Sequence, residues 1–458
     1  MMDTIHFSQE IPIRHRAGIC VVGAGPAGCA AATVAAEQGA DVLLIESGAM
    51  CGGMSTAGRV PVFMPWSDGI RILCEGYGRR ILQALKEEGK RHDFETGCSI
   101  HAEHLKRIYE QFLEESGARL LYYSRLAAVR QEEGRVRQAV FAAPGGMFAV
   151  EAEVFVDATG DGSLAAWAGA PFERGDEHGH VMPSTLCSVW TGFDWDAYRR
   201  GGIFSHNDER MPALLEEAFH SGLLPEEDYH HTGVFRIARS CAVGNFSHVF
   251  DVDSTDERSL TEGIRRNRKL LARYETFYRT RIPGFSKAEI IDSGSVLGVR
   301  ESRRILGDYV LTKADYDARR SFDDEIGRYN FPADLHPDRP GKAEILAHKR
   351  LFRSSACGKG ESYGIPYRIL LPRNLDNVLT CGRCVSTDRH VHASLRVIPG
   401  AYITGQAAGM AAALSLRRSC PPRALPGTDV RSALAAAHAL PASAAPSENS
   451  GKESSPSS

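Results

Sequence analysis

Residues 19–46 read ICVVGAGPAGCAAATVAAEQGADVLLIE, and this stretch decides the fold. A short β-branched run at 19–22 predicts a buried strand, and the glycine-rich sextet at 23–28 predicts a tight turn. The alanine-rich segment that follows predicts a helix that stops near Gly39, and 41–46 predicts a second strand. Strand, turn, helix and strand in this order indicate a Rossmann-like α/β unit built on a parallel sheet.

The sextet has the spacing that binds a dinucleotide pyrophosphate when it joins a strand to a helix. Gly23 permits the turn, Gly25 lets backbone N–H groups approach the phosphates, and Gly28 allows the helix to pack closely on the strand. The helix N-terminus favours negative charge, and Glu46 is placed to accept hydrogen bonds from a ribose. A plain turn without a ligand is the alternative, which the surrounding strands and helix disfavour. The predicted contacts are Gly23, Ala24, Gly25, Pro26, Ala27, Gly28 and Glu46.

A second loop follows Glu46 directly and indicates which dinucleotide is bound. In a nicotinamide-dependent dehydrogenase the chain normally enters another helix here, whereas a flavoprotein wraps a loop around the pyrophosphate and ribityl chain. The loop and the end of a later strand at 153–158 supply Ser47, Gly52, Gly53, Met54, Ser55, Thr56, Thr159, Gly160 and Asp161. No second glycine-rich sextet stands between a strand and a helix, so we expect no separate nicotinamide-binding domain. The sequence therefore favours FAD.

Three further motifs give a resemblance to a known family. They are VLGVRESRRILGDYVLT at 296–312, GRCVSTDRHVHASLRVIPG at 382–400 and TGQAAG at 404–409. Together they resemble the bacterial FAD-dependent oxidoreductases, which are distantly similar to succinate dehydrogenase, fumarate reductase and the glucose-inhibited-division flavoproteins. The resemblance implies an FAD-binding domain of the glutathione reductase type. It also implies adenine contacts near Leu126 and isoalloxazine contacts from Gly382, Arg383, Gly405, Ala407 and Ala408.

The chain divides by composition into four segments. Residues 17–170 and 371–420 are expected to form the FAD-binding domain, because both contain the buried strands and small-residue helices of that fold. Residues 171–370 are less regular, and we expect an inserted α+β substrate domain there. Residues 421–458 shift to Ala, Pro and Ser, which predicts a disordered tail.

Composition excludes several classes of protein. The formal net charge of -3 leaves no basic surplus for nucleic acid. Eleven cysteines without the spacing of a disulfide scaffold indicate reduced thiols. We find no signal peptide and no apolar run long enough to cross a membrane. The expectation is a cytoplasmic protein.

The candidates for the chemistry lie in the last two long motifs. His390 and His392 alternate, so in an extended segment they point the same way, and either can act as general acid or base. Simple hydrogen bonding within a tight loop is an equally good interpretation. Arg396 is a candidate anchor for a carboxylate or for the flavin.

Two other clusters leave alternatives open. Arg300 can share a helix face with Arg303 or Arg304 and clamp a substrate anion. An internal Arg–Glu network that joins the domains is the alternative that we favour. Cys381 and Cys384 form a C-x-x-C pair, but no second pair stands at zinc-site spacing, so we expect packing rather than a metal site or a redox dithiol.

These features predict an FAD-dependent oxidoreductase that transfers a hydride between a small polar metabolite and the flavin. His390 or His392 would move the proton, and Arg396 with Arg300 would position the substrate. The alternatives are an enoate reductase resembling fumarate reductase and an FAD-holding biosynthetic or RNA-modifying enzyme without redox turnover. The expected partners are the small-molecule substrate and an unidentified electron acceptor or donor.

Overall fold

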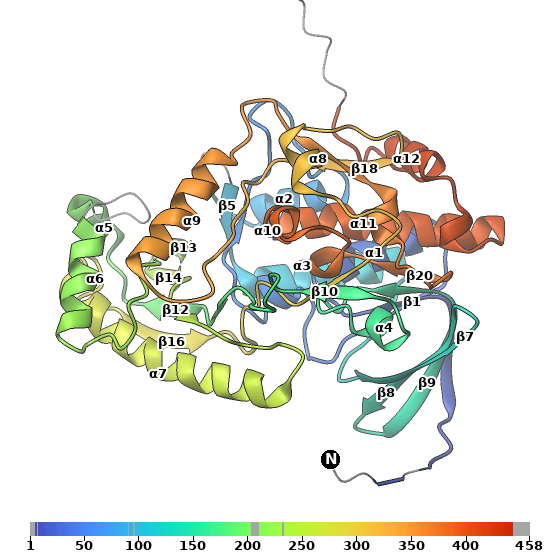
Figure 1. Cartoon of the computed structure of the whole chain (residues 1–458), viewed down its shortest axis with the longest axis horizontal. Helices are drawn as coiled ribbons and strands as arrows, with labels where there is room; N and C mark the ends of the chain where they lie inside the picture. Colours follow the sequence, from blue (N-terminus) through green and yellow to red (C-terminus); the bar gives the residue numbers. More distant parts are fainter. Residues whose placement is uncertain are drawn as a thin grey trace, which may run out of the picture.

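The structure is a computed structural model that describes residues 5–6, 8–89, 91–94, 97–202, 210–230 and 233–442. It confirms the predicted α/β architecture (Figure 1). A parallel sheet has long helices on one face and an antiparallel meander on the other, and an α+β region lies beside it.

The parallel part of the central sheet runs in the order β6, β2, β1, β9 and β20. The bounds are Arg119–Leu121 for β6, Val42–Ile45 for β2, Ile13–Val22 for β1, Gly146–Asp157 for β9 and Val378–Thr380 for β20. Val22 pairs with both Ile45 and Asp157, and Asp157 pairs with Thr380. The carboxyl ends of these strands therefore meet at one edge, where open α/β sheets bind their ligands.

Alternate residues of β1 face two different cores, as the pleat of a strand requires. Ile19 and Val21 pack in the core beneath the long helices, whereas Cys20 and Val22 pack against the meander. The helices are α1 Pro26–Glu37, α2 Tyr77–Glu87, α3 Ala102–Ser116 and α11 Ile398–Arg418. The meander consists of β7 Arg125–Glu132, β8 Arg135–Ala143 and the first half of β9.

Small residues let α1 and α11 cross at close range (Figure 1). A Cβ added to Gly405 would lie 2.2 Å from the carbonyl oxygen of Ala27. A Cβ added to Gly409 would lie 2.3 Å from the carbonyl oxygen of Ala31. Neither contact is possible for a side chain, so glycine is required at both positions.

The α+β region has its own sheet and its own core. Its antiparallel strands run in the order β13 Val234–Ala238, β14 Cys241–Gly244, β12 Ser188–Thr191 and β16 Glu289–Ser293. Its helices are α5 Trp195–Gly201, α6 Arg210–His220 and α7 Glu257–Arg281. Trp190 packs edge-on against Phe285 with the ring centroids 5.1 Å apart. The aromatic core of this region is distinct from the core of the nucleotide fold.

The remaining elements are short and connect these two parts. The strands are β3 Val62–Phe63, β4 Arg91–Phe94, β5 Gly97–Ile100, β10 Phe172–Arg174, β11 Ser184–Thr185, β15 His248–Val249, β17 Arg303–Ile305, β18 Glu325–Tyr329 and β19 Tyr363–Pro366. The helices are α4 Ser163–Trp167, α8 Lys313–Asp317, α9 Lys342–Ser354 and α10 Arg389–Leu395. Tyr316, Tyr329 and Tyr363 pack in the same core as α1 and α11, so this part of the chain joins the nucleotide fold. The domain boundary at residue 370 stays a prediction.

The predicted disordered tail is wrong at its start. Residues 427–436 form α12, Gly427–Ala436, and its Val430 and Leu434 are buried in the core that contains α11. A composition of Ala, Pro and Ser predicts disorder, but the apolar residues of this segment pack against the core. Residues 443–458 lie outside the described residues.

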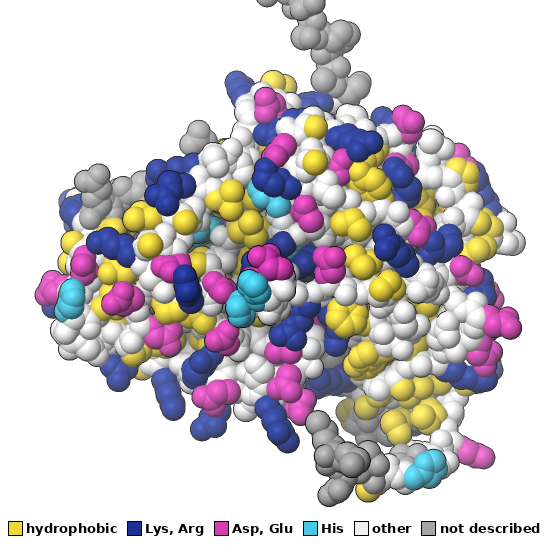
Figure 2. Space-filling view, viewed as in Figure 1, with side chains coloured by type: hydrophobic (Ala, Val, Ile, Leu, Met, Phe, Trp, Pro, Cys, Tyr) yellow, Lys and Arg dark blue, Asp and Glu magenta, His cyan; other side chains and the backbone are white. Residues whose placement is uncertain are grey.

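No helix among the described residues is both long and apolar enough to cross a membrane. On the face drawn in Figure 2, basic and acidic side chains are interspersed rather than gathered into one patch.

Candidate cofactor and substrate site

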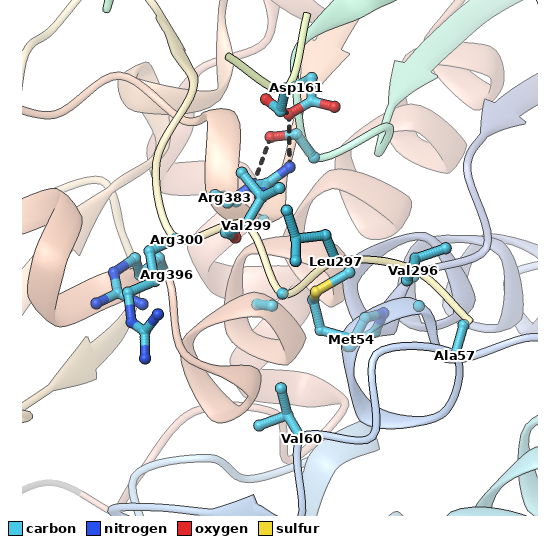
Figure 3. A pocket seen from close by; sticks show the side chains of 18 of the residues that line it. Met54, Ala57, Val60, Asp161, Val296, Leu297, Val299, Arg300, Arg383 and Arg396 are labelled. Carbon is cyan, nitrogen blue, oxygen red and sulfur yellow. Dashed lines mark hydrogen bonds and ion pairs between the residues drawn. The ribbon is translucent and has the colours of Figure 1, made fainter. Parts of the chain in front are cut away.

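A cavity of about 1370 Å³ opens at the carboxyl ends of the parallel strands, between the nucleotide fold and the inserted region. Met54, Val60 and Leu297 line one part of it, with Leu297 beside Met54 (Figure 3). Arg300 and Arg396 lie next to each other away from these residues (Figure 3). The cavity therefore has a glycine-rich end and an arginine-rich end.

Most residues predicted to bind FAD line the glycine-rich end. They come from the turn after β1, the loop after β2, the start of β7, the turn after β9 and the turn after β20. They are Gly23, Gly25, Pro26, Ala27, Glu46, Ser47, Gly53, Met54, Leu126, Thr159, Gly160, Asp161, Gly382 and Arg383.

Gly25 shows that this end fits a bound pyrophosphate. It is the N-cap of α1, with φ -66° and ψ -179°, which any residue adopts. A Cβ added there would meet no protein atom within 4 Å. The space in front of the helix N-terminus is thus open, and the partial positive charge of α1 favours a phosphate in it.

Glu46 is held in position at the end of β2. One carboxylate oxygen accepts a hydrogen bond of 2.8 Å from the Ala24 backbone N–H. The other accepts bonds from Ser47 Oγ at 2.9 Å and from the Gly48 N–H at 2.7 Å. Its carboxylate therefore faces the cavity in a fixed orientation, as ribose recognition requires.

The other predicted residues of this end support the cavity without lining it. Gly28 needs its missing side chain, because an added Cβ would lie 1.8 Å from the Gly23 carbonyl oxygen. The Gly52 N–H donates to the Ala24 carbonyl at 2.7 Å, which holds the second loop against the first. Ala24, Gly28, Gly52, Ser55 and Thr56 are therefore structural neighbours of the cavity.

A buried carboxylate and an arginine organise the turn after β9. Asp157 accepts hydrogen bonds from Thr159 Oγ1 at 2.7 Å and from the Ala165 N–H at 2.8 Å. Arg383 donates to the Gly160 carbonyl at 2.9 Å and to the Asp161 carboxylate at 2.6 Å, and it also donates to Val299. Arg383 thus connects the turn after β20 to the turn after β9 and to the segment that contains Val299 (Figure 3).

The predicted contacts of Gly405, Ala407 and Ala408 with the flavin ring are not supported. Helix α11 begins at Ile398, with a proline in its first turn, so 404–409 lies inside the helix. All three residues are buried and do not line the cavity. The cavity is lined instead by Ile398 and Val397, which stand at the true N-terminus.

The geometry predicted for His390 and His392 is wrong. Both belong to α10, whose N-cap Asp388 accepts from the Val391 N–H at 2.8 Å, so they point to different sides of a helix. His390 packs edge-on against Tyr316 at 5.1 Å between centroids. Neither histidine lines the cavity.

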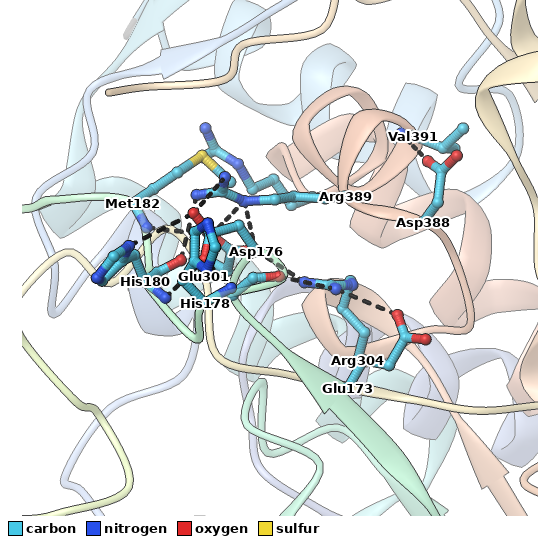
Figure 4. Close-up of polar contacts among 12 residues, drawn as sticks. Glu173, Asp176, His178, His180, Met182, Glu301, Arg304, Asp388, Arg389 and Val391 are labelled. Atoms are coloured by element: carbon cyan, nitrogen blue, oxygen red, sulfur yellow. Dashed lines mark hydrogen bonds and ion pairs between the residues drawn. The ribbon is translucent and has the colours of Figure 1, made fainter. Parts of the chain in front are cut away.

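The GVRESRR segment is not a helix; it is irregular up to β17. Glu301 is fully buried and accepts from Arg304 at 2.8 Å, from Arg389 at 3.1 Å and from the Met182 N–H at 3.0 Å (Figure 4). This is the internal Arg–Glu network that we favoured, and it joins α10 to the inserted region. Arg300 is not part of it.

Arg300 instead projects into the cavity. It donates to the Pro183 carbonyl at 2.9 Å and to Thr185 Oγ1 at 2.7 Å, and no carboxylate of the described residues forms an ion pair with it. Burial, with a contribution from Arg396, lowers the pKa of Arg300 to about 10, so it remains a cation at neutral pH.

Arg396 is paired. It donates to the Asp334 carbonyl at 2.9 Å and to the Asp334 carboxylate at 3.1 Å. Burial acts to raise the pKa of Asp334, but the hydrogen bond with His336 and the Arg396 cation hold it well below its usual range. The Asp334 carboxylate is therefore charged and satisfied.

Sequence reasoning missed three histidines at this end: His230, His336 and His348 all line the cavity. Burial lowers the pKa of His336 well below its usual value, and it lowers that of His348 as well. The Asp334-x-His336 spacing was the one local signal for them. They come from distant segments of the chain, so their meeting could not be read from a motif.

The C-x-x-C pair behaves as expected from packing. Cys381 and Cys384 are free and buried, and burial raises the pKa of both thiols. A thiol kept protonated in this way is a poor nucleophile, so these side chains act as small apolar groups.

Comparison with solved structures finds similar chains at low sequence identity. A geranylgeranyl bacteriochlorophyll reductase-like protein from Thermoplasma acidophilum is 16% identical with a TM-score of 0.44, covering 88% of this chain and 80% of that one. The flavin-dependent brominase Bmp2 is 12% identical with a TM-score of 0.48, covering 91% and 83%. The myxobacterial chondrochloren halogenase CndH is 12% identical with a TM-score of 0.45, covering 91% and 78%.

No curated protein matches the sequence. The family model described as FAD dependent oxidoreductase matches residues 18–434, which include both parts of the nucleotide fold and the inserted region. The chain therefore belongs to the FAD-dependent oxidoreductase family and is an enzyme whose cofactor is FAD.

Proposed function

We propose that this enzyme transfers a hydride between a small carboxylic acid and the flavin, and that Arg300 binds the carboxylate of the substrate. The observation that carries this proposal is the buried Arg300 cation, which faces the cavity without a carboxylate partner among the described residues. A buried guanidinium is costly unless an anion pairs with it. A substrate carboxylate would supply that anion through bidentate hydrogen bonds.

The glycine-rich end would hold the dinucleotide part of FAD. The phosphates would lie before α1 at Gly25, the ribose at Glu46 and the adenine near Leu126. Residues of the loops at 47–54, 159–161 and 382–383 would hold the rest of the cofactor. The flavin, when bound, supplies the hydride chemistry itself.

The arginine-rich end would then orient the substrate. Thr185 and Pro183 fix the guanidinium of Arg300, so little side-chain freedom is lost when a substrate binds. Arg396 is neutralised by Asp334 and would contribute shape and hydrogen bonds more than net charge. The proposed proton transfer by His390 or His392 finds no support, since neither lines the cavity.

The test follows the anaerobic loss or return of visible flavin absorbance with a panel of small molecules. The panel pairs carboxylic acids that carry a C–H bond next to a hydroxyl or amino group, and their unsaturated counterparts, with the matching neutral amides. We expect acids to react and amides to react poorly. Equal reaction with the amides would contradict a carboxylate anchor.

A variant pair locates the anchor. Arg300→Gln should slow the reaction with the best acid about a hundredfold, because it removes a charge-assisted bidentate contact worth about 2.7 kcal/mol. FAD should stay bound, since Arg300 is at the other end of the cavity. Arg236→Gln is the matched control: Arg236 lies on β13 beside the cavity but does not line it. Equal effects of the two changes would exclude Arg300 as the anchor.

A further inference from the structure

Three histidines from separate segments meet at the wall of the cavity. His230 follows the end of the α6 region, His336 precedes α9 and His348 lies on α9. Each offers a ring nitrogen, and these nitrogens all lie within 4.8 Å of one another. The rings of His230 and His336 have centroids 4.7 Å apart, and those of His336 and His348 are 4.8 Å apart. All three line the cavity.

The hydrogen bonds behind two of these rings set which nitrogen faces inward. His336 Nε2 bonds the Asp334 carboxylate at 3.1 Å, and its buried Nδ1 has no partner among the described residues. His348 Nδ1 bonds the Leu335 carbonyl, so Nε2, which lies 3.7 Å from the Asp334 carboxylate, is the nitrogen that can face a metal ion. A carboxylate or carbonyl on the outer nitrogen of an imidazole is the usual support of a metal-ligating histidine, because it fixes the tautomer and the ring orientation.

Asp228 and His248 hold His230 in place. Its backbone N–H donates to the Asp228 carboxylate at 3.0 Å. Its ring stacks on that of His248, with centroids 4.1 Å apart, and His248 Nδ1 bonds Asp228 at 3.2 Å. The buried carboxylate of Asp228 and the partly buried one of Asp334 therefore lie on two sides of the cluster.

From this geometry we propose that His230, His336 and His348 bind one divalent transition-metal ion, of the Zn²⁺ and Fe²⁺ class, in the wall of the substrate cavity. Three imidazoles suit these ions, whereas Mg²⁺ and Ca²⁺ prefer oxygen ligands. Three protein ligands leave at least one coordination position for a group from the cavity. The site was not predicted, because its ligands stand at no zinc-site spacing in the sequence.

The surrounding charges permit a cation. Asp228 is buried and Asp334 is partly buried; both carboxylates lie next to the cluster, and both interact with the Arg300 cation. Arg300 opposes a metal ion through its charge, so a substrate carboxylate between the two would satisfy both. The alternative is that the histidines bind the substrate directly and no metal is involved.

The experiment measures metal in the FAD-loaded protein. The protein is stripped with a chelator and dialysed against micromolar Zn²⁺ or, anaerobically, Fe²⁺; metal and flavin are then quantified per chain. We expect about one metal ion per chain that resists a second dialysis against metal-free buffer. Retention of no metal in the wild-type protein overturns the proposal and favours direct substrate binding.

Variants assign the site. His336→Ala and His348→Ala should each weaken metal binding by at least about tenfold while FAD remains bound. His220→Ala, an exposed histidine at the end of α6, is the control and should bind like the wild type. If His336→Ala does not fold, His348→Ala decides, since the His348 side chain is less deeply buried than that of His336.

A competing site must be separated from this one. Asp176, His180 and Asp338 also bring possible ligand atoms within 4.8 Å of one another, near the surface. Loss of the bound metal in His180→Ala, with retention in His336→Ala and His348→Ala, would overturn the proposal. The measurement uses no substrate, so its result is independent of whether carboxylic acids react with the flavin.

Discussion

The two ends of the cavity are built on different principles. The glycine-rich end consists mainly of backbone at Gly23, Gly25 and Gly53, positioned by contiguous turns at the ends of parallel strands. The arginine-rich end consists of charged side chains such as Arg300, Asp334 and Arg396, which come from segments far apart in the sequence. The first end depends on empty space in front of backbone N–H groups, and the second depends on which of its charges are paired and which are not. Substitutions at the glycine-rich end should therefore reduce FAD affinity, whereas loss of a buried charge near the arginine-rich end should reduce folding stability.

The largest effect is expected where charge pairing supports the arginine-rich end. Glu301→Leu leaves Arg304 and Arg389 without their buried carboxylate, since the Glu301 side chain is fully buried between them. Breaking a buried network in this way costs about 3–5 kcal/mol of unfolding free energy. Urea unfolding of the FAD-loaded protein measures this loss.

Glu103→Leu provides the matched control for that change. Glu103 also pairs with two cations, Arg59 and Lys106, but its side chain is half exposed. A surface pair of this kind contributes at most about 1 kcal/mol. Equal losses in the two variants would contradict the view that burial of the network gives it its weight.

The next effect tests the open space at the glycine-rich end. Gly25→Val should be accepted by the fold, because the backbone conformation is ordinary and the new side chain meets no protein atom within 4 Å of its Cβ. The side chain would fill the place of the phosphates, so FAD affinity should fall about a hundredfold, or about 2.7 kcal/mol. Flavin absorbance per chain after dialysis measures the change.

Gly145→Val controls for the loss of a glycine. Gly145 is exposed in the turn between β8 and β9, and an added Cβ would approach only the flexible end of Arg14. It should keep its FAD. A Gly25→Val protein that retains FAD as well as this control would show that the phosphates do not lie before α1.

The same difference explains what the sequence could predict. The nucleotide fold was predictable because the motif at 23–28 and Glu46 carry their meaning within one strand–turn–helix–strand unit. The sequence identifies Arg300 as a candidate. It does not show that Glu301 belongs to a buried ion-pair network while Arg300 lines the cavity. His230, His336 and His348 were missed, because residues that meet only through the packing of two domains leave no local spacing.

The errors had a local cause as well. The resemblance implies flavin contacts from Gly405, Ala407 and Ala408 in the small-residue motif at 404–409. In the structure those small residues serve the crossing with α1, and the helix begins at Ile398. The alternation of His390 and His392 places both on one side only in an extended segment, but the N-cap Asp388 starts a helix there.

The smallest effect concerns His392, which is buried but lies outside the cavity. Burial, followed by the cations of nearby arginines, lowers its pKa well below the ordinary value of 6.5. Those arginines are Arg396, Arg304, Arg383 and Arg389. Below pH 6.5 His392 is protonated in the unfolded chain but stays neutral in the folded protein. The free energy of unfolding therefore falls as the pH decreases.

Replacing the histidine should remove this part of the acid sensitivity. His392→Leu keeps an apolar group of similar size in a site where neither ring nitrogen has a hydrogen-bond partner among the described residues. The loss of stability below pH 6.5 should then be smaller than in the wild type by about 1.4 kcal/mol per pH unit. Urea unfolding at a series of pH values measures the slope, with His220→Leu as the exposed control. An unchanged slope in His392→Leu would contradict this prediction. The acid sensitivity would then come from other groups, such as the histidines at the arginine-rich end of the cavity.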